Sequence, residues 1–275
     1  MLRPIVKWAG GKRQLLPSIR SLLPSADWTR AAYFEPFIGG AALLLALTPD
    51  NGAINDVNPE LINVYQMIKQ QPDQLIETLR QHRNDEGYYY EIRAWDRNQE
   101  AYAALSPIDR AARLIYLNRT CYNGLYRVNA GGQFNVPFGK YKRPNIIRET
   151  TIRSMSSYLN RANIRMMDGD FAEAVQEARA GDFVYFDPPY DTLTPTAAFT
   201  SYAKGGFGRP EQQRLANVFK ELSERGVYVM LSNHATDYIH QLYEGYRIHT
   251  VKARRSINSK GDGRGVINEV IIMNY

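Results

Sequence analysis

Short apolar segments alternate with amphipathic, helix-like segments along most of this chain, and that alternation most limits the folds open to it. Strands are expected within 31–37, ending near Asp56, and at 164–167, 183–186, 227–232, 247–251 and 266–273. Helices are expected after Gly40, from Pro59 onward, and at 73–80, 171–179, 210–225 and 237–242. Because parallel strands need a crossover, which is usually a helix, this order predicts an α/β fold with a mostly parallel sheet.

The residues between about 58 and 165 do not follow this alternation. After two helices, a segment rich in aromatic residues and arginine runs with helical character to Asn118, and a turn-rich stretch containing Asn123-Gly124 follows it. Asn-Gly is a strong hairpin signal, so a β-hairpin is expected there. We therefore predict one domain of residues 1–57 and 166–275, interrupted by a mostly helical domain of residues 58–165.

The composition of the 275 residues narrows the class of protein. Hydrophobic residues make up 44% and charged residues 23%, and no apolar run approaches the roughly 20 residues of a membrane-spanning helix. Cys121 is the only cysteine, so no disulfide can form within the chain, and with four scattered histidines it gives no zinc-like cluster. We expect a soluble, cytoplasmic, monomeric protein without a structural metal.

Positive charge is concentrated in two segments of a chain whose net charge is +6. Residues 110–165 contain eleven Lys/Arg and one acid, Glu149, and residues 251–265 contain five Lys/Arg and one acid, Asp262. Either segment alone is compatible with a solvated face. Two such segments, interleaved with aromatic residues or glycines, favour a nucleic-acid partner.

Three strand ends carry residues that suit a nucleotide-like ligand, which open parallel sheets bind beyond the carboxyl ends of their strands. Gly39 and Gly40 let the backbone approach a ligand at the start of a helix, or simply form a tight turn. Asp56 is placed to accept both hydroxyls of a ribose, or to cap a helix. The DGDF segment at 168–171 offers an acid and a ring for an adenine, or a cap for the next helix.

A fourth strand end carries Asp187-Pro188-Pro189-Tyr190. Each part suits an exocyclic amine on a flat base, which is a poor nucleophile because its lone pair is delocalised into the ring. The Asp187 carboxylate and the Pro188 carbonyl can each accept one N–H, which favours a pyramidal nitrogen with a free lone pair. The prolines fix the backbone without adding a donor, and Tyr190 offers a stacking face. The alternative is a strand-ending turn with a surface tyrosine.

Five segments occur in a distinctive order: VKWAGGK at 6–12, FEPFIGGA at 34–41, LNRTCYNGLYRVNAGGQFNVPFGKYKRP at 117–144, YFDPPY at 185–190 and VKARRSIN at 251–258. Over nearly its whole length the chain resembles the Dam-type DNA adenine-N6 methyltransferases, with the motif order of the alpha group. The resemblance implies a Rossmann-like, S-adenosylmethionine-dependent methyltransferase sheet with an inserted target-recognition domain that carries the hairpin. It implies site-specific methylation of a flipped-out adenine in double-stranded DNA within GATC, and association with the nucleoid.

The resemblance also implies roles for individual residues. The catalytic residues would be Asp187, Pro188, Pro189 and Tyr190. The contacts with S-adenosylmethionine would be Trp8, Gly10, Lys12, Glu35, Phe37, Gly39, Asp56, Asp170, Phe171 and Asp187. The contacts with DNA would be Lys7, Arg119, Tyr122, Asn123, Leu125, Arg127, Pro137, Arg254 and Arg255. Arg127 is the candidate for reading a guanine, because arginine donates two hydrogen bonds to guanine O6 and N7.

One position departs from the family pattern F-x-G-x-G, because Ala41 stands where the second glycine is often found. Other substrates for such an enzyme are cytosine N4, an RNA base or a glutamine side chain, and a DNA-binding relative without catalysis is a further alternative. A covalent mechanism through Cys121 is disfavoured, because this residue lies far from Asp187 in the sequence. A phosphate-loop ATPase is excluded, because Arg13 follows Lys12 and the required glycine spacing is absent.

Overall fold

The computed structural model describes residues 2–8, 10, 12–25, 31–193, 206–254 and 266–275. In this part of the chain, seven strands form one sheet in the order β3-β2-β1-β4-β5-β7-β6. They are β1 (Tyr33–Glu35), β2 (Asn51–Asn55), β3 (Asn163–Met167), β4 (Phe183–Phe186), β5 (Tyr228–His234), β6 (Arg247–Arg254) and β7 (Val266–Met273). The first five in sheet order are parallel, and β7 runs antiparallel to both β5 and β6. This confirms the predicted α/β, mostly parallel sheet.

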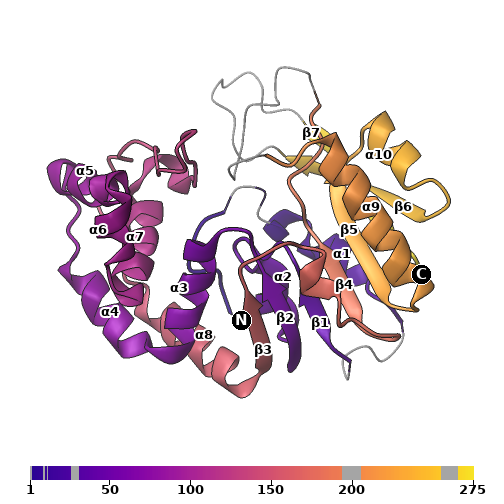
Figure 1. Cartoon of the computed structure of the whole chain (residues 1–275), viewed down its shortest axis with the longest axis horizontal. Helices are drawn as coiled ribbons and strands as arrows, with labels where there is room; N and C mark the ends of the chain where they lie inside the picture. Colours follow the sequence, from indigo (N-terminus) through magenta and orange to yellow (C-terminus); the bar gives the residue numbers. More distant parts are fainter. Residues whose placement is uncertain (1, 9, 11, 26–30, 194–205, 255–265) are drawn as a thin grey trace.

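Most of the helices gather in two groups on either side of the molecule, α3 to α8 beyond β3, and α9 and α10 beyond β5, and α1 and α2 lie between these groups (Figure 1). The α-helices are α1 (Leu16–Ser21), α2 (Ala42–Leu47), α3 (Pro59–Gln70), α4 (Pro72–Gln81), α5 (Glu86–Ala94), α6 (Gln99–Ala103), α7 (Pro107–Thr120), α8 (Glu149–Arg161), α9 (Arg209–Glu224) and α10 (Asp237–Leu242). Short 3-10 helices are η1 (Lys12–Gln14), η3 (Trp95–Arg97), η4 (Tyr122–Gly124) and η5 (Glu173–Val175).

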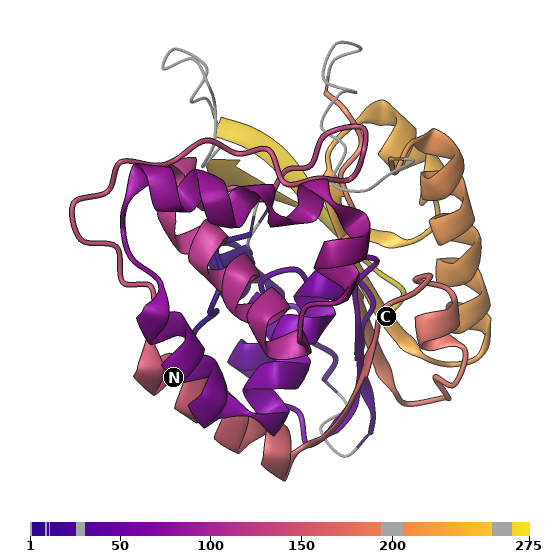
Figure 2. The same cartoon turned by 60° about the vertical axis from the view of Figure 1, so that its left-hand side comes forward.

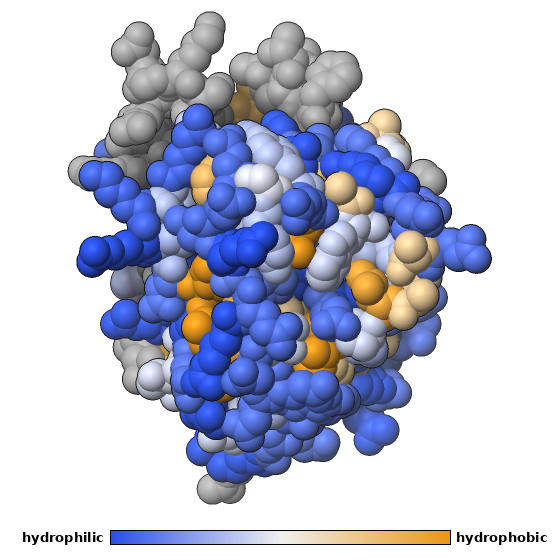
Figure 3. All heavy atoms as spheres, turned by 90° about the vertical axis from the view of Figure 1, so that its left-hand side faces the viewer, coloured by the Kyte–Doolittle hydropathy of each residue, from blue (hydrophilic) through white to orange (hydrophobic). Residues whose placement is uncertain are grey.

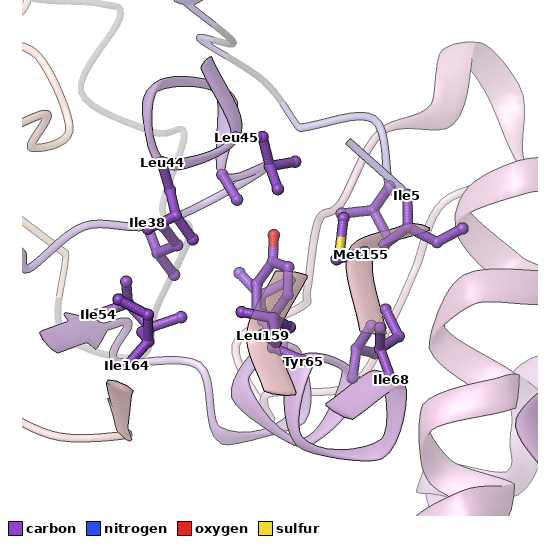
Figure 4. Close-up of a cluster of buried hydrophobic side chains, with 14 of the residues drawn as sticks. Ile5, Ile38, Leu44, Leu45, Ile54, Tyr65, Ile68, Met155, Leu159 and Ile164 are labelled. Carbon is purple, nitrogen blue, oxygen red and sulfur yellow. The ribbon is translucent and has the colours of Figure 1, made fainter. Parts of the chain in front are cut away.

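Alternate residues of the central strands enter two separate cores. In β4, Phe183 and Tyr185 join one cluster, and Val184 and Phe186 join the other, because successive side chains of a strand point to opposite faces. The first cluster includes side chains from α1, α2, α3, α4, α7 and α8, and Figure 4 shows part of it around Tyr65. The second includes side chains from α9 and α10. Both faces of the sheet are therefore covered, as the continuous apolar sequence of β4 requires.

The helix predicted at 171–179 is wrong. Only the single 3-10 turn η5 forms there, between β3 and β4. The chain has to reverse within this short connection, and Asp182 accepts the backbone N–H of Arg179 at 2.8 Å and that of Ala32 at 2.8 Å. These contacts direct the segment into β4 before a helix can lengthen. The other predicted strands and helices are present, with ends shifted by a few residues at most.

The predicted hairpin turn at Asn123-Gly124 is also wrong. Asn123 lies in η4 with a φ of 55°, and the chain reverses farther on, where the Asn129 side chain accepts the N–H groups of Gly131 and Gln133 at 3.0 Å. Two isolated antiparallel bridges join 121 to 138 and 128 to 134. Residues 121–138 thus run back along themselves, and we call them the recognition loop, after the role that the sequence resemblance implies for this segment. Asn-Gly favours a left-handed turn in several contexts, and here it follows a helix rather than a strand.

The segment 58–165 packs in two ways, one shared with the sheet and one within the segment itself. Helices α3 and α8 share the sheet's first core, for example through Ile68 and Leu159. Helices α5 and α7 pack with the recognition loop in a cluster of their own that includes Tyr89, Tyr116 and Phe134. Figure 2 shows these helices stacked in front of the sheet. The domain boundaries at 57/58 and 165/166 stay a prediction.

The outer face of this helical group is mostly hydrophilic, with apolar side chains in small separate spots (Figure 3). Among the described residues, no helix combines the length and apolar character that crossing a membrane requires. Within the same part of the chain, no three His, Cys, Asp or Glu side chains are grouped as ligands for a metal ion.

The pairing of β1 with β2 generates a test of the fold. Gly52 lies opposite Tyr33, and a Cβ atom at Gly52 would come within 1.9 Å of the Tyr33 carbonyl oxygen. Gly52→Ala is therefore expected to lower the free energy of unfolding by at least about 3 kcal/mol, measured by urea denaturation. The matched control is Gly87→Ala in the first turn of α5, where the nearest atom would lie 3.4 Å away and helix propensity favours alanine by up to about 1 kcal/mol. Equal stabilities of Gly52→Ala and the unaltered protein would contradict this strand register.

Candidate active site

The turn that follows β4 lies against the N-terminal segment of the chain. The Asp187 carboxylate is 20% exposed and forms an ion pair of 2.5 Å with the Lys12 ammonium, whose side chain is 6% exposed. The same ammonium donates to the Gly10 carbonyl at 2.6 Å and lies 4.6 Å from the centre of the Tyr190 ring. Four residues predicted from two distant motifs are thus brought together, with a cation held between a carboxylate and an aromatic face.

Tyr190 is fixed from three sides rather than exposed in a surface turn. Its hydroxyl donates to Glu269 Oε2 at 3.1 Å, and its ring meets that of His234 edge to face at 4.9 Å. Glu269 in β7 and His234 in β5 are partners in the antiparallel ladder. The third contact is the Lys12 ammonium over the ring. Sequence reasoning missed Glu269 and His234, because the contact needs the antiparallel β5–β7 pairing to bring them to Tyr190.

The backbone of this turn is held by side-chain amides. Gln212 in α9 donates to the Pro189 carbonyl at 2.8 Å, and the N–H of Asp191 donates to Asn233 Oδ1 at 2.9 Å. The Pro188 carbonyl accepts no hydrogen bond from any residue that the structure describes. Within this part of the chain, the second acceptor predicted for an exocyclic amine is thus without a donor.

Burial changes the acid–base properties of two carboxyl groups here. Loss of solvation raises the pKa of Asp187 to about 6, against the opposing effect of the Lys12 cation. Loss of solvation raises the pKa of Glu35 to about 8, although Glu35 accepts hydrogen bonds from the Tyr33 hydroxyl at 2.7 Å and the Leu44 N–H at 3.1 Å. Glu35 is therefore held against the first turn of α2.

The glycine turn after β1 packs tightly against the N-terminal motif. Gly39 has a φ of 44°, and a Cβ there would lie 2.8 Å from Trp8. Trp8 in turn stacks on Tyr126 of the recognition loop, with ring centres 4.8 Å apart. Ala41, at the start of α2, also takes a left-handed conformation, with a φ of 58°. This conformation favours glycine and costs alanine about 1 kcal/mol, which gives a physical reason why glycine is often found at this position.

Asp56 lies where β2 ends and the turn into α3 begins. Its Oδ2 accepts the Gly39 N–H at 3.1 Å and its Oδ1 accepts the Asn58 N–H at 3.0 Å. Burial raises the pKa of Asp56 to about 6. Each carboxylate oxygen keeps a further lone pair, so a ribose diol fits this acid. Tyr65 of α3 supports the same turn, because its hydroxyl donates to the Gly39 carbonyl at 2.7 Å.

Asn55, just before Asp56, joins two loops of the site and was not predicted. Its Nδ2 donates to the carbonyls of Pro36 and Gly169, both at 3.0 Å, and its Oδ1 accepts the Gly169 N–H at 2.9 Å. It therefore ties the loop after β1 to the loop after β3. An amide side chain at the end of an otherwise apolar strand is the sequence signal that points to such a residue.

The loop after β3 brings aromatic rings to the glycine turn. Phe171 stacks on Phe37 with ring centres 5.4 Å apart. Asp170 pairs with Arg214 of α9 through both oxygens, at 2.9 and 2.5 Å, and the same guanidinium lies 4.1 Å from the centre of the Phe171 ring. Arg214 holds the pKa of Asp170 below its usual range. The acid and ring predicted for an adenine are thus adjacent, but an unpredicted arginine contacts both.

The DNA candidates fall on the recognition loop and beside it. Tyr122, Asn123, Arg127 and Pro137 are exposed, and Leu125 is half-buried. The N–H of Tyr122 donates to the Pro137 carbonyl at 2.8 Å, which joins the two arms of the loop. Arg127 Nε donates to Asn135 Oδ1 at 2.7 Å.

The remaining DNA candidates have different positions. Lys7 lies 5.3 Å from the Tyr141 ring centre, and Arg119 donates from Nε to the Asn145 carbonyl at 2.9 Å. Arg254 ends β6, and its side chain, like the whole of Arg255, lies outside the described part of the structure.

Asn118, which was not predicted, links the N-terminal motif to the recognition loop. It accepts the Lys7 N–H at 2.7 Å and donates to the carbonyls of Lys7 at 2.7 Å and Gly124 at 3.0 Å. Its side chain is 1% exposed. Nothing in the local pattern of a helical asparagine indicates this bond, because its partner lies 111 residues away.

Cys121 is unsuited to nucleophilic catalysis. It is fully buried, and its thiol donates to the Leu125 carbonyl at 3.2 Å. Burial raises the pKa of the Cys121 thiol to about 12, so the reactive thiolate is scarce at neutral pH.

Comparison with known proteins agrees with this arrangement. Residues 8–257 match the family model of the D12 class N6 adenine-specific DNA methyltransferases. The chain is 49% identical to the Type II methyltransferase M1.LlaDCHI of Lactococcus lactis subsp. cremoris, over 100% of this chain and 96% of that protein. It is 40% identical to the Type II methyltransferase M.MjaIII of Methanocaldococcus jannaschii, over 100% and 99% of the two chains. It is 34% identical to the DNA adenine methylase of Escherichia coli (strain K12), over 98% and 95%. The chain therefore belongs to the D12 class of N6 adenine-specific DNA methyltransferases, whose methyl donor is S-adenosylmethionine.

Proposed function

We propose that this DNA adenine-N6 methyltransferase acts on an adenine that has been flipped out of the duplex, and that it does so within GATC. The observation that supports the reaction centre is the Lys12 ammonium, a nitrogen with N–H groups, held against Asp187 and over the Tyr190 ring. The exocyclic amine of an adenine stacked on Tyr190 needs the same two neighbours. We take these two contacts of the lysine as support for an amine-binding position between Asp187 and Tyr190.

The chemistry proposed for the chain's own residues follows from this site. Asp187 accepts one N–H of the amine and the Pro188 carbonyl accepts the other, so the nitrogen lone pair is directed at the methyl donor. Tyr190 holds the base plane, and its own position is held by Glu269 and His234. When bound, S-adenosylmethionine supplies an electrophilic methyl group on a sulfonium. The proton that the amine loses passes to Asp187. Position and electrostatics therefore carry the catalysis.

The residues that would hold S-adenosylmethionine lie at the ends of β1, β2 and β3 and on the N-terminal motif. Asp56 would bind the ribose hydroxyls, and the Phe37 and Phe171 rings would contact the adenine, beside Asp170. The motif at Trp8, Gly10 and Lys12, with Glu35 and Gly39 beneath it, would hold the methionine part. The residues present fit this cofactor, because the Asp56 carboxylate has lone pairs left for the ribose hydroxyls and the stacked rings of Phe37 and Phe171 can contact the adenine.

Base flipping is proposed because N6 is enclosed in the base stack of duplex DNA, whereas the Asp187 side chain is only 20% exposed. Extrusion of a base costs a few kcal/mol. Tyr122, 53% exposed at the tip of η4, and Asn123 beside it are placed to fill the vacated space. Lys7, Arg119, Arg254 and Arg255 would neutralise phosphates, and Leu125 and Pro137 would contact the duplex.

The assignment of residues 58–165 as the DNA target-recognition domain is part of this proposal. Its support is the exposed recognition loop and the excess of basic residues over acids in 110–165. The GATC context rests on the resemblance of residues 117–144 to the inserts of GATC-specific relatives. We further propose that the protein acts as a monomer at the nucleoid.

The role of Asp187 generates the first test of this proposal. Asp187→Ala removes the acceptor for the amine and is expected to abolish incorporation of tritiated methyl groups into duplex DNA. Cys121→Ser is the comparison, and it should keep most of the activity because the thiol takes no part. Methyl transfer by Asp187→Ala would contradict the mechanism.

The raised pKa values of Asp187 and Asp56 generate a second test, because protonation of each acid should change a different measured quantity. Asp187, with a pKa of about 6, can take the proton of the amine only when it is ionised, so acidification below pH 6 should lower the single-turnover rate at saturating cofactor, by about tenfold per pH unit. Protonation of Asp56, whose pKa is also about 6, should instead weaken cofactor binding over the same pH range. Calorimetry and rapid-quench kinetics measure the two effects separately. A single-turnover rate that stays constant from pH 7.5 to 5 would rule out an ionised Asp187 in the step.

Arg127 generates a third test. If its guanidinium reads a guanine, Arg127→Ala should reduce the discrimination between GATC and a duplex altered at that guanine by about 10–100-fold in kcat/KM. Arg161→Ala, which removes an exposed cation at the end of α8, should leave kcat/KM unchanged for both duplexes. If Arg127→Ala discriminates between the two duplexes as well as the unaltered protein does, another residue reads the guanine.

A further inference from the structure

We propose that Gln212 of α9, together with Asn233 at the end of β5, positions the catalytic turn for methyl transfer without belonging to the surfaces that bind cofactor or DNA. The inference rests on the proposed function of Asp187 and Tyr190. Its own basis is a closed set of hydrogen bonds around Tyr190, made by two side-chain amides that lie in different elements.

The two amides are buried and use both of their polar ends. Gln212 is 1% exposed, and its Nε2 donates to the Pro189 carbonyl at 2.8 Å. Its Oε1 accepts from Asn233 Nδ2 at 3.1 Å. Asn233 is fully buried, and its Oδ1 accepts the Asp191 N–H at 2.9 Å. The bonds therefore run from the residue before Tyr190 to the residue after it.

The turn needs such support because of its own sequence. Pro188 and Pro189 have no N–H, and the parallel ladder between β4 and β5 ends at Phe186. The proline rings fix φ but leave ψ free, so the carbonyl of Pro189 is held in place by Gln212. Gln212 thus bonds one of the two proline carbonyls, and the neighbouring Pro188 carbonyl accepts no hydrogen bond from the residues that the structure describes.

Asp191 anchors the far end of the same turn. Its Oδ2 accepts from the Thr236 hydroxyl at 2.7 Å, and its carbonyl oxygen meets His234 Nδ1 at 2.7 Å. His234 also contacts the Tyr190 ring. The turn is thus fixed on both sides of Tyr190 by residues of α9, β5 and the start of α10, and Gln212 is the member that reaches it from α9.

The test compares two neighbouring glutamines on α9. Gln212→Met keeps the length of the side chain and removes both hydrogen bonds. The single-turnover methylation rate at saturating cofactor and DNA should fall by about 10–100-fold, because a displacement of about 1 Å in a reacting geometry has an effect of that order. The dissociation constants for S-adenosylmethionine and for GATC duplex should change by less than about twofold. Gln213→Met is the control, since Gln213 is exposed and its side chain donates to Asn217 Oδ1 at 3.3 Å on the same helix, and all three parameters should stay unchanged.

A residue needed only for general stability would give a different result. Loss of rate in parallel with loss of cofactor and DNA affinity, or an unaltered rate in Gln212→Met, would overturn the assignment. Gln212→Glu, which preserves size and keeps the acceptor for Asn233 but loses the donor to Pro189, should show the same selective loss of rate. If neither variant folds, Gln212 is a structural residue and the inference is wrong. If Asp187→Ala is inactive while Gln212→Met is fully active, this inference fails and the proposed function stands.

Discussion

The parallel alignment of five strands is the constraint on which this molecule depends. Parallel strands end at the same edge of a sheet, so Glu35, Asn55, Asp187 and His234, far apart in the sequence, all lie where β1, β2, β4 and β5 stop. The antiparallel strand β7 then returns beside β5 and brings Glu269 to the same edge. The helices cover both faces of the sheet, and this edge is left for ligands.

Electrostatics at that edge follow from burial. Glu35, Asp56 and Asp187 all lose solvation, which raises the pKa of each, and the partners that oppose this are few and specific: backbone N–H groups at Asp56, the Tyr33 hydroxyl at Glu35 and the Lys12 ammonium at Asp187. In the proposed function the Lys12–Asp187 pair would be the least permanent of these, because the target amine would take the place of the ammonium. Binding of the base would then exchange one N–H donor for another, and the carboxylate would not be left unpaired.

The sequence predicted the sheet, most helices and the motif residues at the strand ends, because these depend on local patterns of apolar residues, glycine, proline and acids. It did not predict Gln212, Arg214 or Asn118. Each of them acts through partners 23 to 111 residues away, and a glutamine or asparagine in a helix has the same local pattern whether it is buried or solvated. The two local errors have a related cause. The connection at 171–179 is redirected by Asp182, and Asn123-Gly124 follows a helix, so in each case a neighbouring element outweighed the local propensity.

The central claim is that the site at Asp187 and Tyr190 methylates N6 of an extruded adenine in a defined sequence. The most direct measurement is to incubate the purified protein with S-adenosylmethionine and a plasmid of known sequence, and then to map modified bases by single-molecule sequencing. The account predicts N6-methyladenine on both strands of GATC sites, with other adenines and all cytosines unmodified. A plasmid without modified adenines, or one with modified cytosines, would contradict it.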